Sequence, residues 1–88
     1  MSIKKFQEKY PDIKITKYIH SNIYWLTRHI DSHTTKEVAN LNVEDKKYIL
    51  CDYGYTEEQL DDIRLLYKYL LKEYKKREEL KRKREENG

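Results

Sequence analysis

The sequence predicts an all-α fold, a compact bundle of four or five helices whose long C-terminal helix ends in a charged, solvated extension. Apolar residues recur at spacings of three and four, and the only internal proline and glycine are Pro11 and Gly54. Charged residues make up 40% of the 88 residues and hydrophobic residues 38%, so the core must be thin. We expect residues 1–75 to form one helical domain and residues 76–88 a charged helical tail.

The first expected element is a short helix at the N-terminus. Ser2 is a suitable cap, and Ile3, Phe6 and Tyr10 then share one face. Pro11 ends this helix, because the residue before a proline is pushed out of the α region.

Residues 12–31 carry an apolar stripe whose spacing of 4, 4, 3 and 4 is typical of one helix face. Its members are Ile15, Ile19, Ile23, Leu26 and Ile30. A short strand over residues 12–19 is the alternative, because Ile13 and Ile15 alternate with lysines. We prefer the helix, since the stripe continues without a break through the polar residues that follow.

The middle of the chain predicts two shorter helices. Thr34 and Glu37 form a capping box for a helix that runs through Leu41. Asn42 can cap a second helix, and Gly54 supplies the left-handed position that ends it.

The last helix is expected to be the structural spine, with Thr56 as its cap. Its apolar stripe consists of Leu60, Ile63, Leu66, Tyr67, Leu70, Leu71 and Tyr74. Ile63 and Leu70 should be almost fully buried. Beyond the stripe, residues 75–86 are charged apart from Leu80, which predicts a solvated extension.

The sequence lacks the signatures of an enzyme, a cofactor site or a metal site. Gly54 is the only internal glycine, so no phosphate-binding glycine loop exists. His29 and His33 lack the further ligands that zinc requires. Cys51 is expected to be a small core residue, and a single cysteine fits the reducing cytoplasm. No apolar run approaches the roughly 18 residues needed to span a membrane.

We therefore expect a non-enzymatic interaction module, a regulator or inhibitor that docks on a larger protein. By analogy of size and composition, it would suit a phage or mobile element. Tyrosine is enriched at protein interfaces, and the chain has nine tyrosines. Acids also cluster where the last helix begins. The expected partner-binding residues are Tyr48, Tyr53, Tyr55, Glu57, Glu58, Asp61 and Asp62. A homodimer through the C-terminal helix is a further alternative.

The charge distribution leaves nucleic acid as a second class of partner. Residues 1–31, 32–71 and 72–88 carry net charges of +3, −3 and +3 (6 − 3, 5 − 8 and 8 − 5). The expected phosphate-contacting residues are Lys36, Lys46, Lys47, Lys81, Arg82, Lys83 and Arg84. Glutamates bracket the last four of these, which favours a solvated charged helix there.

Two segments resemble parts of a DNA-binding regulator. Residues 34–43, TTKEVANLNV, resemble the first helix and turn of a helix-turn-helix. Residues 54–60, GYTEEQL, are similar to the segment that opens the following helix in MerR-like winged domains. The turn is one residue shorter than that pattern and has no glycine. The resemblance implies a helix-turn-helix-like transcriptional regulator as the alternative function, with residues 34–53 on the DNA.

Overall fold

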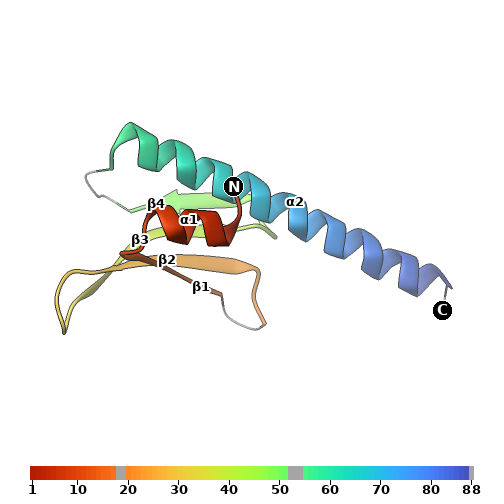
Figure 1. The fold of residues 1–88 in the computed structure, drawn as a ribbon. Coiled ribbons are helices and arrows are strands. Elements are labelled where there is room, and N and C mark those ends of the chain that lie inside the picture. Colours follow the sequence, from red (N-terminus) through yellow and green to blue (C-terminus); the bar gives the residue numbers. More distant parts are fainter. Residues whose placement is uncertain (18–19, 52–54, 88) are drawn as a thin grey trace.

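The structure, a computed structural model, describes residues 1–17, 20–51 and 55–87, with side chains in the last helix described as far as Arg84. It is an α+β fold and not a bundle of helices (Figure 1). The elements are α1 (Ile3–Lys9), β1 (Ile13–Lys17), β2 (Ile23–His29), β3 (Thr35–Asn42), β4 (Lys47–Leu50) and α2 (Glu57–Asn87). The strands form one antiparallel sheet in the order β1-β2-β3-β4. The all-α prediction is therefore wrong.

The helix expected over residues 12–31 is replaced by β1 and β2. This stretch is rich in β-branched and aromatic residues, which fit a pleated sheet better than a helix. Ile15 of β1 pairs with Leu26 of β2, so two members of the expected helical stripe are cross-strand neighbours. The strand alternative at Ile13 and Ile15 is the correct one for β1. Ile19 lies outside the described residues.

The two helices expected between residues 34 and 53 are also wrong as far as the chain is described. Thr34 and Glu37 do not form a capping box, because β3 begins at Thr35. Leu26 pairs with Ala39 and Thr27 pairs with Glu37, which leaves Val38 as the extra residue of a β-bulge. Both Val38 and Ala39 are buried, so the bulge breaks the strand alternation in the sequence. Residues 34–51 consequently contain no helix-turn-helix, and Gly54 lies outside the described residues.

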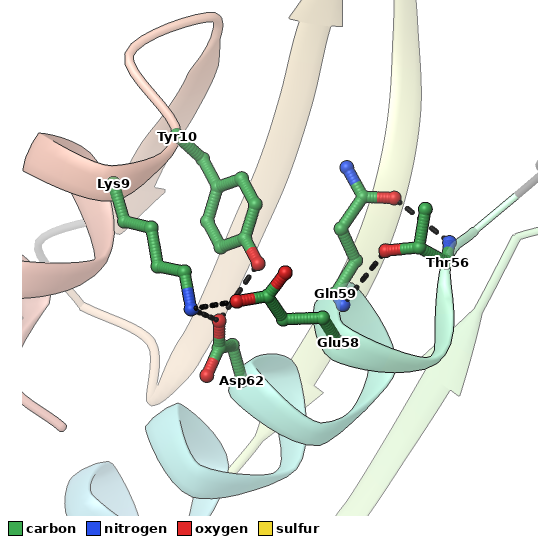
Figure 2. A network of polar contacts seen from close by, with 6 residues as sticks. All are labelled: Lys9, Tyr10, Thr56, Glu58, Gln59 and Asp62. Atoms are coloured by element: carbon green, nitrogen blue, oxygen red, sulfur yellow. Dashed lines mark hydrogen bonds and ion pairs between the residues drawn. The ribbon is translucent and has the colours of Figure 1, made fainter.

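The two terminal helices were predicted correctly. The Ser2 hydroxyl accepts a hydrogen bond from the Lys5 amide at 3.2 Å and caps α1. At the start of α2, the Thr56 hydroxyl accepts from the Gln59 amide at 3.1 Å, and the Gln59 side chain accepts from the Thr56 amide at 3.0 Å (Figure 2). This reciprocal pair is a capping box, and it fixes where α2 begins.

Both helices lie against the same face of the sheet. Phe6 of α1 and Ile63, Leu66 and Leu70 of α2 join one buried cluster with the core-facing strand residues. Ile63 and Leu70 are only 1% and 2% exposed, as predicted. The second half of α2 projects past the end of the sheet (Figure 1). None of the described helices combines the length and the apolar character that crossing a bilayer requires.

Candidate functional site

The sheet face opposite the helices is the candidate site, and we call it the open face. Cross-strand partners point to the same side of an antiparallel sheet, so the register assigns each residue to a face. The open face carries Lys14, Thr16, Ile23, Trp25, Thr27, Asn40, Asn42, Lys47 and Ile49. The core residues Ile13, Tyr24, Leu26, Ala39 and Leu41 alternate with them and point to the helices.

A single row of residues crosses the centre of the open face. Thr16 pairs with Trp25, Trp25 with Asn40, and Asn40 with Ile49, one residue from each strand. Trp25 is half-buried among its neighbours, whereas Ile49 is 62% exposed. Ile23 lies two residues before Trp25 on the same strand and therefore on the same face. The centre thus combines an indole and two branched aliphatic side chains with amide and hydroxyl groups.

The charged residues of the open face stand at its margins. Lys14 belongs to one edge strand and Lys47 to the other. Glu37 also lies on the open face, because it pairs with Thr27 beside the bulge. No ionisable side chain lies in the central row, which can supply apolar contact and hydrogen bonds but no acid or base. Among the residues that the structure describes, no group of three or more His, Cys, Asp or Glu side chains is placed to hold a metal ion.

A second polar cluster joins the two helices on the covered side of the sheet (Figure 2). Lys9 Nζ lies 2.7 Å from Asp62 Oδ2 and 2.7 Å from Glu58 Oε1. The Tyr10 hydroxyl donates a hydrogen bond to Asp62 Oδ2 at 2.7 Å. We call these four residues the helix latch, because two come from the end of α1 and two from the first turns of α2.

The helix latch holds its protons in a defined state. Burial by itself would raise the pKa of Asp62, but the hydrogen bonds from Lys9 and Tyr10 outweigh it and leave the pKa below its ordinary value. Burial and the bond to Asp62 raise the pKa of Tyr10 to about 12. Hydrogen bonds to Asp62 and Glu58 also raise the pKa of Lys9. Asp62 therefore accepts as a carboxylate from the Lys9 ammonium and from the neutral Tyr10 hydroxyl, and the cluster is a structural link between the helices.

The structure scatters the residues predicted to bind a protein partner. Asp62 is buried in the helix latch, and Glu58 contacts Lys9 there. Asp61 is exposed beside Arg64, with a nitrogen–oxygen distance of 3.7 Å. Glu57 is exposed in the first turn of α2. These acids therefore surround the start of α2 and lie away from the open face.

The predicted tyrosines lie on the covered side or outside the described chain. Tyr48 of β4 contacts Tyr67 of α2, with ring centroids 5.0 Å apart. The Tyr55 hydroxyl donates a hydrogen bond to the carbonyl oxygen of Val38 and helps to close the bulge. Tyr53 lies outside the described residues. Tyr48 and Tyr55 thus have packing roles in the structure, and neither joins the open face.

The predicted phosphate-contacting residues are brought together only in part. Lys46 occupies the β3–β4 turn with a φ of 56°, and it lines a hollow of about 270 Å³ together with Arg82 of α2. Tyr74 and Lys75 line the same hollow, as do the acids Glu78 and Glu79. Lys36, Lys81, Lys83 and Arg84 are exposed, and Lys47 belongs to the margin of the open face.

The central row of the open face is absent from the residues predicted from the sequence. Asn40 and Asn42 alternate with Leu41 and Val43, which is the two-residue period of a half-buried strand. That signal was available. It was hidden because the bulge at Val38 shifts the alternation by one residue just before it.

No family model matches this chain, and neither a curated protein nor a solved structure matches it. The fold and the site alone define its class. It is a small α+β protein in which two helices cover one face of a four-stranded antiparallel sheet, and none of the described elements covers the other face.

Proposed function

We propose that this chain is a non-enzymatic interaction module that docks on a larger protein through the open face. The observation that carries the proposal is the central row, in which Trp25 and Ile49 lie on a sheet face that no described element covers. As a small regulator or inhibitor of this kind, it would act in the cytoplasm, where a single free cysteine stays reduced.

The composition of the open face favours a protein as its partner. The core of a protein interface is depleted in charge and enriched in aromatic residues, and tryptophan is among the residues that most often dominate binding energy. Ile23 lies beside Trp25 on the same strand and Ile49 lies beyond Asn40 in the same row, while Asn40 and Asn42 can exchange hydrogen bonds at the same surface. The lysines stand at the two edges, where they set orientation and association rate more than affinity.

These features specify the chemistry of the partner. It should offer an apolar depression for the indole, polar groups for the two asparagines, and little net charge across the contact. A nucleic-acid backbone suits this face less well, because the lysines that the strand register places on it, Lys14 and Lys47, stand at opposite margins. Burial also raises the pKa of the Cys51 thiol, which lowers its thiolate fraction and disfavours nucleophilic chemistry.

A crosslinking experiment tests the proposal. A photoreactive amino acid is placed at position 40 of the full chain, and a matched control carries it at Leu80 on the projecting part of α2, which is 60% exposed. We expect a discrete adduct with one larger protein from position 40 and none from position 80. The adduct protein, once purified, should bind the Trp25→Ser variant at least about tenfold more weakly than the wild type.

Two results would overturn the docking proposal. One is an adduct that consists of two copies of this chain, which would make the open face a dimer interface. The other is a purified partner whose affinity is unchanged by Trp25→Ser but reduced by Leu80→Ser.

A further inference from the structure

The projecting half of α2 carries three cations in line with the core-facing residues of its first half. In the first half, Ile63, Leu66 and Leu70 face the sheet at spacings of three and four. The same helical spacing continues that face through Arg77, Lys81 and Arg84, which follow Leu70 after seven, eleven and fourteen residues. We call these three residues the basic stripe. Beyond the end of the sheet, the face that builds the core has become cationic.

The acids of this segment lie on more than one side of the helix. Glu78 and Glu79 line the hollow beside the β3–β4 turn, where Lys75 and Arg82 accompany them. That side therefore carries mixed charge. Of the two glutamates that precede the run of cations, Glu79 lies away from the basic stripe, whereas Glu78 lies one turn before Lys81.

The cations of the basic stripe are available to a ligand. Arg77, Lys81 and Arg84 are exposed, and none forms an ion pair within 4.0 Å among the described side chains. Glu73 precedes Arg77 by one turn, but its carboxylate lies 3.7 Å from Lys76. Glu78 and Glu85 stand three residues before and four residues after Lys81 in the sequence. The two arginines are therefore the stronger part of the stripe.

We propose that the basic stripe binds the phosphate backbone of a nucleic acid. The seven steps from Arg77 to Arg84 rise about 10 Å along the helix, which is about three phosphate spacings of 3.4 Å along one strand of a duplex. Arginine forms bidentate hydrogen bonds with phosphate oxygens, and a lysine adds a point charge between them. These contacts would position the protein without reading sequence.

The composition of the stripe argues for a polyanion over other occupants. A helix that lies on a lipid surface needs an apolar face to insert among the headgroups. A helix that pairs with another helix needs apolar residues at every turn. Residues 75–84 contain one apolar residue, the exposed Leu80, and so meet neither requirement.

This inference goes beyond the docking function and uses a separate surface. The basic stripe lies on α2, whereas the open face lies on the side of the sheet that faces away from the helices. Variants of one surface leave the other intact, so either proposal can fail alone.

Fluorescence anisotropy with a labelled 20-base-pair DNA duplex and a labelled 20-nucleotide RNA strand tests the inference across salt concentrations. The triple variant Arg77→Gln, Lys81→Gln, Arg84→Gln removes the stripe. The matched control Lys72→Gln, Lys75→Gln, Arg82→Gln removes three cations from elsewhere on the same projecting half. Circular dichroism verifies that both variants keep the helix.

The wild-type chain should bind with a logarithmic salt slope that the stripe variant lowers by about 2 on single strands and almost 3 on duplex. Its affinity at low salt should fall at least about tenfold, and the control should lose much less. Equal losses in both triples would show an effect of net charge alone and overturn the inference. Binding to phosphatidylserine vesicles with no binding to either nucleic acid would also overturn it.

Discussion

Asp61 and Asp62 are adjacent residues with different surroundings. Asp61 points to solvent near Arg64, while Asp62 is buried and receives contacts from Lys9 and Tyr10. Helical rotation of about 100° per residue is enough to separate a solvated acid from a structural one. The four acids at the start of α2 therefore do not share one role. The residues that each acid contacts in the fold decide whether it is solvated or structural.

The substitution Asp62→Asn should weaken the fold near neutral pH, and this effect should disappear on the acidic side. The folded pKa of Asp62 is lowered, so its contribution to the free energy of unfolding is present above about pH 4, its ordinary range, and is lost as the pH falls through the folded value. Near neutral pH we expect a loss of about 1–2 kcal/mol, discounted because the Lys9 partner is partly exposed.

Urea denaturation at several pH values measures this effect. The control Asp61→Asn should change stability by less than about 0.5 kcal/mol. Equal losses for the two variants, or a loss for Asp62→Asn that persists unchanged well below pH 3, would contradict the role of the helix latch.

The long helix α2 serves two purposes along its length. Its first half supplies Ile63, Leu66 and Leu70 to the core, and its second half projects as a charged arm (Figure 1). Its 31 residues correspond to about 46 Å of helix, far longer than the strands that it covers. Within α2, the buried apolar residues that cover the sheet therefore all belong to the first half.

We expect Leu70→Ala to cost about 2–5 kcal/mol, because it opens a cavity under the sheet-covering half of α2. Leu65→Ala is the matched control, since Leu65 occupies the same helix and is 47% exposed. Thermal unfolding followed by circular dichroism compares the two. A Leu70→Ala protein that melts within a few degrees of the Leu65→Ala protein would show that α2 does not form the core.

The helices could be predicted from the sequence and the strands could not, for identifiable reasons. Ser2 and Thr56 are caps followed by regular apolar spacing, and such local signals determine a helix without help from the rest of the chain. The stripe through Ile15, Ile23 and Leu26 fits a helical spacing as well as it fits two strands. The pairing that decides between them involves residues far apart in sequence.

The candidate site could not be predicted for the same reason, because it depends on contacts between residues far apart in sequence. Trp25 and Ile49 acquire a common surface only when β2, β3 and β4 pair, so no local pattern identifies them together. The charged residues of the projecting half of α2 are recognisable in the sequence. Which of its cations share one side depends on the rotation of the helix around its axis. The nucleic-acid interpretation of residues 34–53 depended on a helix where β3 forms.

The whole molecule has a covered side and an open side. Two helices and the helix latch stabilise one face of the sheet, and no described element covers the other face. The arm of α2 extends the longest dimension to 51 Å and presents the basic stripe beyond the sheet. The two surfaces that we propose for a protein and for a nucleic acid do not overlap.

The most direct test of the docking account is the fluorescence of Trp25, which is the only tryptophan of the chain and lies at the centre of the open face. The partner identified by crosslinking is prepared with its own tryptophans replaced by phenylalanine. It is added to the wild-type chain while the emission and the acrylamide quenching of Trp25 are recorded. If the open face docks, the emission of Trp25 shifts to shorter wavelength and quenching falls several-fold at saturation, because the indole becomes buried. Saturable binding that leaves both the emission and the quenching of Trp25 unchanged would contradict the account.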